Sequence, residues 1–354
     1  MKILVIQHKM IGDVLISSLL CENLKKAFPS AIVHYLVNSN TLPVLENNPF
    51  IDKLIVFNEK KDTGLFKLIA FSKTVNKNEY DIVIDAYSKI QSWISVFINK
   101  ASKKISYKKM GRTFLYTHNV IKHNEPKSSL GLAIEHRLLL LKPLGIKNAL
   151  ATEPKLYLTE KEIENAKKSL EKHCVDPNRK TVMISLLGSD ESKTYPLNEM
   201  AKMVDFLGLH YNVNILFNYF PSQKTQAQTV YNQLSTETQS KIYFDLLGGD
   251  LREFIALANQ CDLIIGNDGG AINMTKALGK KSFIIFSPWI DKNVWATFED
   301  NISHTSVHLK DYFLENFGSL TNKQIKKQVD LFYSFFKFEL FKEKLRKFLD
   351  LHLK

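Results

Sequence analysis

The chain lacks several features that would mark other classes of protein. Its three cysteines, Cys21, Cys174 and Cys261, lie in unrelated segments of the 354 residues. Their spacing fits neither a disulfide framework nor a zinc site, which predicts a reducing, cytoplasmic setting. No apolar run approaches the roughly 20 residues that span a bilayer. The start, MKILVIQHKMIGD, is interrupted by polar residues, which is untypical of a signal peptide and favours a first buried strand.

Common cofactor and metal motifs are also missing. The sequence contains neither G-x-x-x-x-G-K-[ST] nor G-x-G-x-x-G, which disfavours a P-loop nucleotide hydrolase and a dinucleotide oxidoreductase. It has no D-x-D motif and no histidine cluster. We therefore expect a function that needs no metal and no bound cofactor.

Acidic residues are too few to balance the basic ones. The chain has 48 Lys and Arg against 36 Asp and Glu, which gives a net charge of +12. A nucleic acid, an anionic membrane surface and a phosphorylated substrate would each suit that charge. Most of the excess is lysine spread along the chain, without zinc-finger spacing, an RNP-like motif or an arginine-rich helix. These features disfavour nucleic acid and leave the other two partners open.

The hydrophobic pattern predicts an α/β fold with two similar halves. Apolar runs of strand length alternate with helix-length segments, which indicates doubly wound parallel sheets covered by helices. The predicted strands of the first half cover 2–7, 32–37, 53–57 and 82–86. Those of the second half cover 181–187, 214–218, 242–246, 262–266 and 282–286. We therefore predict one domain at 1–150 and another at 151–320.

The last segment, 321–354, predicts a long amphipathic helix with interleaved aromatic residues and lysines. Its apolar face would pack on the protein. The alternative is a helix that lies in the interface of a membrane, and the sequence leaves both open.

The most informative motif is the strand–turn–helix–strand pattern of 262–288. Its turn contains Asp268, Gly269 and Gly270 at the expected carboxyl end of a strand, where open α/β sheets bind ligands. Glycine lets backbone N–H groups approach a ligand, and a helix N-terminus favours an anion. The alternative is a tight turn in which Asp268 only caps the helix.

Two further turns carry chemistry-bearing residues. Gly12, which permits a sharp turn, and Asp13 lie where the first strand gives way to a helix. Asp13 is either a structural N-cap or a carboxylate that accepts a proton from a substrate. The hydroxyl-rich turn from Ser189 to Lys193 follows another strand, and its hydroxyls, N–H groups and lysine suit a phosphate. The alternative there is a solvated loop.

The basic segment 100–112 predicts a contact with an anionic group. It reads KASKKISYKKMGR and includes Lys103, Lys104 and Arg112. We expect these residues, together with Gly12, to contact an acceptor substrate through its phosphates, or to meet anionic lipid headgroups. A solvated loop is the alternative.

Taken in order, these motifs resemble those of the lipopolysaccharide heptosyltransferases, glycosyltransferase family 9. The resemblance runs from the N-terminal MKILVI and IGDVL, through G-S-x-x-x-K-x-[YW]-P, to CDLIIGNDGG and the helix after it. It implies the GT-B fold, in which two Rossmann-like domains face a cleft and a C-terminal helix crosses back to the first domain. It also implies transfer of heptose from an ADP-activated donor to a lipopolysaccharide core acceptor, with inversion and without metal.

The resemblance also implies roles for individual residues. Asp13 matches the family's general base, which acts on the acceptor hydroxyl. Ser189 and Lys193 match its contacts to the donor diphosphate. Its D-[ST]-G donor loop is matched by Asp268, Gly269 and Gly270.

Three positions depart from the family pattern. Gly269 replaces the usual hydroxyl residue, Asn273 stands where the family has His, and Gln223 is nearest to its acidic ribose contact. Asn still forms hydrogen bonds but cannot become cationic.

The leading prediction is an inverting, metal-independent glycosyltransferase of the cell envelope. Its partners would be a nucleotide-sugar, a glycolipid acceptor and the cytoplasmic face of the inner membrane. One alternative is a GT-B protein that binds the nucleotide-sugar without turnover. The other is a GT-B sugar-nucleotide epimerase.

Overall fold

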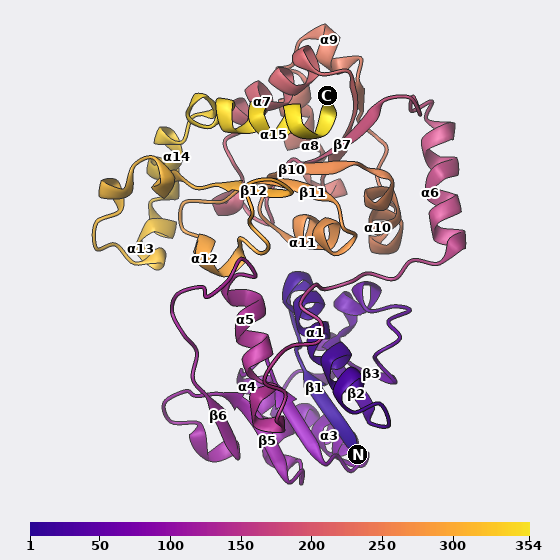
Figure 1. Cartoon of the computed structure of the whole chain (residues 1–354), viewed down its shortest axis with the longest axis vertical. Helices are drawn as coiled ribbons and strands as arrows, with labels where there is room; N and C mark the ends of the chain where they lie inside the picture. The colour runs from indigo at the N-terminus through magenta and orange to yellow at the C-terminus, as the bar shows by residue number, and fades with distance from the viewer. The chain divides into compact units, whose positions relative to one another are not determined.

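The computed structural model describes residues 1–354, apart from the side chain of Asn316, and the chain forms two compact units. The first unit is Met1–Tyr157 and the second is Leu158–Lys354, so the division falls after Tyr157 rather than after residue 150. Each unit contains a six-stranded parallel sheet flanked by helices (Figure 1). The predicted α/β class with two doubly wound halves is confirmed.

The first unit has the strand order β3-β2-β1-β4-β5-β6. Its strands are β1 (Lys2–Ile6), β2 (Ile32–Asn38), β3 (Lys53–Phe57), β4 (Ile82–Asp85), β5 (Lys103–Tyr107) and β6 (His118–Val120). Its helices are α1 (Ile11–Ala27), α2 (Glu59–Asp62), α3 (Leu65–Asn76), α4 (Ile90–Ile98) and α5 (Leu132–Leu139), with 3-10 turns η1 (Ser39–Val44), η2 (Thr113–Leu115) and η3 (Lys142–Leu144). Because β1 pairs with both β2 and β4, the chain winds outward from β1 in both directions.

The second unit has the strand order β12-β11-β10-β7-β8-β9. Read from β9 with β7 taken as its first strand, this is the same order as in the first unit. Its strands are β7 (Lys180–Ser185), β8 (Val213–Asn218), β9 (Ile242–Tyr243), β10 (Leu263–Asn267), β11 (Lys281–Ile285) and β12 (His304–Val307). The helices among them are α6 (Glu160–Lys172), α7 (Leu197–His210), α8 (Lys224–Tyr231), α9 (Thr236–Gln239), α10 (Leu251–Gln260), α11 (Gly270–Ala277) and α12 (Lys292–Trp295). The 3-10 turns are η4 (Glu191–Lys193), η5 (Pro221–Gln223), η6 (Leu309–Asp311) and η7 (Leu314–Phe317).

The central strands are apolar because helices cover the sheet. In β1 the residues from Ile3 to Ile6 are at most 1% exposed, as expected for a parallel strand that is buried on both sides. The sequence pattern missed β5, which lies inside the basic segment 100–112. Its Ile105, Ser106 and Tyr107 are buried, but the lysines at its start hide the apolar pattern.

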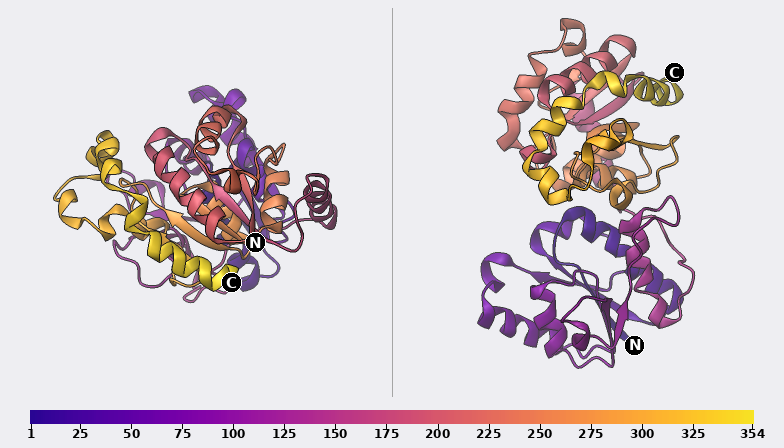
Figure 2. Two further views of the ribbon diagram at one scale, coloured as in Figure 1. Left: turned by 90° about the horizontal axis from the view of Figure 1, so that it is seen from above. Right: turned by 90° about the vertical axis from the view of Figure 1, so that its left-hand side faces the viewer.

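The C-terminal segment is not one continuous helix, and in this respect the prediction over 321–354 is wrong. It forms α13 (Asn322–Lys327), α14 (Val329–Phe335), η8 (Phe338–Leu340) and α15 (Lys342–Leu353). Figure 2 shows this segment in yellow along the second unit. None of the described helices is long and apolar enough to cross a bilayer.

Buried aromatic rings explain where this segment bends. Phe336, Phe338 and Phe341 are at most 2% exposed and join the core of the second unit. The Tyr195 hydroxyl donates to the Phe336 carbonyl at 2.8 Å, and the Phe338 N–H donates to Glu199 at 2.8 Å. The bend therefore buries three rings while the freed backbone groups keep partners.

Candidate functional site

Each sheet has one pair of strands from which the chain winds in opposite directions. These pairs are β1–β4 and β7–β10. Open α/β sheets bind ligands at the carboxyl ends of such a pair. Asp13 follows β1, the loop from Ser189 to Lys193 follows β7, and Asp268 follows β10. Topology thus places the main predicted residues at the ligand-binding edge of their own units.

Asp13 lies in the first turn of α1 and is not its N-cap. The N-cap is Met10, whose φ of 62° makes the sharp turn that the sequence suggested for Gly12. Gly12 lies within the helix and is buried. The N-cap alternative for Asp13 is therefore wrong. Its carboxylate still benefits from the positive end of the helix dipole.

A buried arginine holds this carboxylate. Arg137 of α5 donates from Nη2 to Asp13 Oδ1, and its Nε and Nη1 donate to Ser17 Oγ at 3.2 Å and Ala133 O at 3.1 Å. The Arg137 side chain is 11% exposed and that of Asp13 is 22% exposed. Asp13 Oδ2 has no hydrogen bond to a described residue, so Arg137 orients one oxygen while the other has no protein partner.

The other carboxylate at this edge is fully engaged. Asp85 ends β4, accepts the Tyr116 hydroxyl at 2.7 Å and the Ser88 N–H at 2.7 Å, and is completely buried. Burial raises the pKa of Asp85, and these hydrogen bonds oppose the rise. Asp85 therefore fixes the loop after β4, and Asp13 is the better candidate for a base.

Two lysines lie on this side of the sheet: Lys109, which belongs to the basic segment 100–112, and Lys122, which lies outside the motifs of the sequence analysis. Lys122 Nζ is 4.0 Å from the centroid of the Tyr107 ring. Partial burial, together with the charges of Arg137 and Lys109, lowers the pKa of Lys122 to about 8. Lys109 donates to the Ser88 carbonyl at 2.8 Å. Lys109 follows the carboxyl end of β5 and Lys122 that of β6. Lys122 interacts electrostatically with Asp13, and Lys109 with Asp85.

Lys103 and Lys104 do not lie at this edge, contrary to expectation. They begin β5, where Lys103 pairs with Ile82, and Ile82 in turn pairs with Ile3 at the start of β1. A strand advances about 3.3 Å per residue, so the length of the sheet separates them from Asp13. Arg112 follows β5, and its guanidinium lies 3.7 Å from the centroid of the Trp93 ring.

In the second unit, Asn267 fixes the loop after β7. Its Nδ2 donates to the carbonyls of Ser185 at 3.1 Å and Leu186 at 2.8 Å, and its Oδ1 accepts the Tyr195 N–H at 2.7 Å. Asn267 is 1% exposed. One buried amide therefore holds both ends of the loop that carries Ser189 and Lys193.

Segments after two other strands also hold this loop. Ser287 Oγ and Trp289 Nε1, after β11, both donate to the Ser192 carbonyl, at 2.7 and 2.9 Å. Gln223, after β8, donates to the Gly188 carbonyl at 2.9 Å and accepts the Phe220 N–H at 3.0 Å. Both ends of the Gln223 amide are thus used to position the loop, a role different from the predicted ribose contact.

Ser189 and Lys193 remain available to a ligand. Ser189 is exposed, and its hydroxyl lies 3.4 Å from Asp190. Lys193 Nζ lies 5.5 Å from the Trp289 ring centroid. Burial raises the pKa of Asp268, against the nearby charges of Lys193 and Lys276. The loop after β7 and the turn after β10 are therefore electrostatically coupled through Lys193 and Asp268.

The turn after Asp268 does not require glycine at position 269. Gly269 has an extended backbone with φ of 171°, and a Cβ placed on it would meet nothing within 4 Å. The hydroxyl residue of the family pattern would therefore fit. Gly270 begins α11, and Asn273 Nδ2 donates to the Gly269 carbonyl at 3.1 Å.

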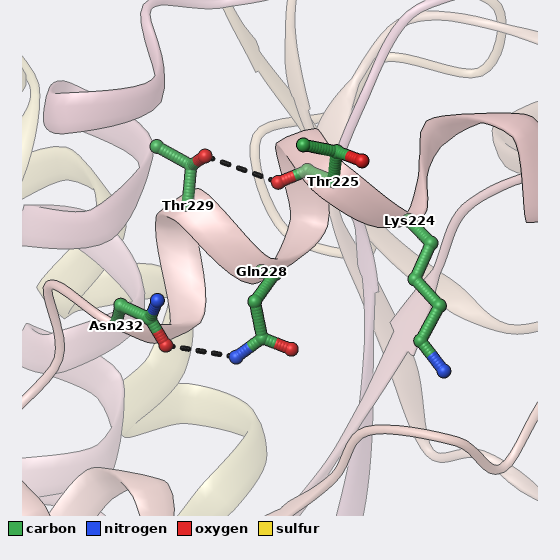
Figure 3. A pocket seen from close by; sticks show the side chains of 5 residues that line it. All are labelled: Lys224, Thr225, Gln228, Thr229 and Asn232. Atoms are coloured by element: carbon green, nitrogen blue, oxygen red, sulfur yellow. Dashed lines mark hydrogen bonds between the residues drawn. The ribbon is translucent and has the colours of Figure 1, made fainter.

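A surface depression of about 410 Å³ lies along α8 (Figure 3). Its lining residues are Lys224, Thr225, Gln228, Thr229 and Asn232. Gln228 donates to Asn232 at 2.8 Å and Thr229 donates to the Thr225 carbonyl at 3.0 Å. Because one helix lines it and its polar groups bond to one another, we do not consider it the functional site.

Two units of Rossmann strand order, similar to those of solved glycosyltransferase structures, identify the GT-B class of two-domain fold. The model of glycosyltransferase family 9 (heptosyltransferase) matches residues 68–329. The chain belongs to this family and is a glycosyltransferase.

Known proteins with similar sequences and structures agree with this assignment. Lipopolysaccharide heptosyltransferase 1 of Campylobacter coli is 24% identical over 295 residues, which cover 81% of this chain and 84% of the relative. A family 9 glycosyltransferase from Veillonella parvula has a TM-score of 0.75 at 18% identity, covering 94% of this chain and 97% of that one. The ADP-heptose lipopolysaccharide heptosyltransferase II of Escherichia coli has a TM-score of 0.68 at 16% identity, with coverages of 94% and 98%.

Proposed function

We propose that the protein transfers heptose from ADP-heptose to an acceptor sugar of the lipopolysaccharide core, with inversion and without a metal ion. The family and the names of its relatives support the donor and the acceptor. The observation that carries the proposal is the geometry of Asp13. One of its oxygens is held by buried Arg137 and the other is free to accept a proton.

The first unit acts on the acceptor. Asp13 removes the proton of the acceptor hydroxyl while the hydroxyl oxygen forms a bond to the anomeric carbon of the donor. The Arg137 pair orients the carboxylate toward the acceptor hydroxyl, and this positioning contributes to the rate. Lys109 and Lys122 supply positive charge for an anionic acceptor.

The second unit acts on the donor. The bond between the anomeric carbon and the diphosphate oxygen breaks, and its electron pair leaves with the nucleoside diphosphate. Lys193, the Ser189 hydroxyl and the N–H groups at the start of α11 stabilise the negative charge that develops there. Attack opposite to the leaving group inverts the anomeric centre in this single displacement.

We also propose that the first unit touches the cytoplasmic face of the inner membrane. Phe97, Met110 and Phe114 are 70%, 99% and 78% exposed, and they lie close in sequence to the basic residues of segment 100–112. Apolar side chains beside lysines suit an anionic lipid surface. We expect the protein to sediment with anionic vesicles at low salt and not with neutral ones; failure to sediment with either would contradict the contact.

The donor can be tested by ligand-induced stabilisation. We expect an ADP-linked sugar to raise the melting temperature, because a ligand at 100 times its Kd stabilises by about 2.7 kcal/mol. GDP- and UDP-sugars at the same concentration should raise it much less. Stabilisation by a UDP-sugar alone would contradict the ADP-linked donor. Conversion of the sugar without any acceptor would favour an epimerase.

A further inference from the structure

Trp289 connects the loop after β7 with the C-terminal segment. Its indole N–H donates to the Ser192 carbonyl at 2.9 Å. Lys193 Nζ lies 5.5 Å from the centroid of its ring, and Lys326 Nζ lies 4.2 Å from the same centroid. Lys326 belongs to α13, far along the chain from Lys193. One aromatic ring therefore holds two ammonium groups from distant segments beside the donor loop.

Contact with an aromatic ring positions a cation without neutralising it. Such contacts are weak at exposed sites, and Lys326 is exposed. No carboxylate of the described residues forms an ion pair within 4.0 Å of either Lys193 or Lys326. Their charges therefore remain available to an anionic ligand.

The charges of Lys193 and Lys326 both act on Asp190, which lies in the loop after β7. Burial raises the pKa of Asp190, but a hydrogen bond from Ser192 and the charges of Lys326 and Lys193 outweigh it, so the pKa is lowered. The Asp190 carboxylate already accepts from the Ser192 hydroxyl at 2.5 Å. The charges of Lys193 and Lys326 therefore both reach the loop that carries Asp190, without an ion pair to its carboxylate in the described part of the chain.

We propose that Lys326 is a second cation for the diphosphate of the donor, supplied by the C-terminal segment and held in place by Trp289. A diphosphate carries more than one negative charge and has acceptor oxygens on both phosphorus atoms, so two separated ammonium groups suit it better than one. This inference rests on the proposed function, because the ligand is the nucleoside diphosphate of that reaction. It adds a binding residue that lies outside the three sequence motifs.

The test compares binding of ADP, AMP, adenosine and inorganic pyrophosphate by calorimetry. We expect Lys326→Ala to weaken ADP and pyrophosphate about tenfold, which corresponds to about 1.4 kcal/mol. AMP should be affected less, adenosine should be unaffected, and Lys326→Arg should restore most of the affinity. Lys327→Ala, an exposed neighbour of the same charge, is the matched control and should leave all four affinities unchanged.

Each outcome decides between the inference and the proposed function. If Lys326→Ala binds ADP and pyrophosphate as the natural protein does, the inference is overturned and the donor site stands. If the natural protein binds pyrophosphate but not ADP, the ADP-linked donor is wrong. If Lys326→Ala then also fails to bind pyrophosphate, the inference about Lys326 stands. If the natural protein binds neither compound, both are overturned.

Discussion

Replacing Asp13 with Asn is expected to slow sugar transfer by about 10²–10⁴-fold, the usual contribution of a general base. Asn keeps the size of the side chain but cannot accept the proton of the acceptor hydroxyl. Because Asp13 belongs to the first unit and the donor loop to the second, the affinity for ADP should change less than twofold. Steady-state kinetics with ADP-heptose and a core acceptor, together with calorimetry, measures both effects.

Glu125→Gln is a suitable control for this variant. Glu125 is an exposed carboxylate of the same unit, in the loop before α5. The Glu125→Gln substitution also removes one negative charge, but it leaves the ion pair between Asp13 and Arg137 intact. The rate of sugar transfer should therefore be unchanged. If Asp13→Asn retains activity within about tenfold, which is about 1.4 kcal/mol of barrier, another group is the base.

Lys193→Ala is expected to lower kcat by about 10²–10³-fold, as for the loss of one group that stabilises charge in a transition state. In the proposed reaction the charge on the diphosphate grows as the sugar leaves, and the Lys193 ammonium group, which lies 5.5 Å from the Trp289 ring centroid, would stabilise it. Lys193→Arg should recover part of the rate, because it keeps the charge but not its position.

Lys224→Ala separates this role from a general loss of positive charge. Lys224 is a half-exposed lysine of the same unit whose ammonium group pairs with Asp245 at 2.8 Å, so its replacement should leave kcat unchanged. An increase in KM for Lys193→Ala with an unchanged kcat would show that Lys193 only binds the donor in its ground state. That result would contradict the proposed stabilisation of the leaving group.

The sequence was sufficient to predict the two sheets and the turns that carry the site. The central strands are apolar on both faces, so their runs are visible without alternation. The carboxyl end of a strand was also predictable wherever a polar or glycine-rich turn follows it. This is why Asp13, the loop from Ser189 to Lys193, and Asp268 lie where the sequence placed them.

Short strands with polar residues were not predictable. In β5 the lysines at positions 103 and 104 are part of a strand, and they lie at the edge opposite Asp13. The bend in the C-terminal segment was also missed. It depends on Tyr195 and Glu199, more than a hundred residues earlier in the chain, which provide partners for the backbone of Phe336 and Phe338.

The residues that position the site were the hardest to predict. Arg137 reaches Asp13 from α5, and Lys326 reaches Trp289 from α13. A local pattern contains no information on such pairings. For Arg137 a weak signal exists, because a single arginine within an apolar helical stretch requires a buried partner.

The central claim is that this chain transfers heptose with inversion, using Asp13 as its base. The most direct measurement is incubation of the purified protein with ADP-heptose and a core acceptor that lacks the heptose, followed by mass spectrometry and NMR of the product. The account predicts addition of one heptose with the opposite anomeric configuration to the donor, and loss of that product in Asp13→Asn. A product with retained configuration, or full activity without the Asp13 carboxylate, would contradict it.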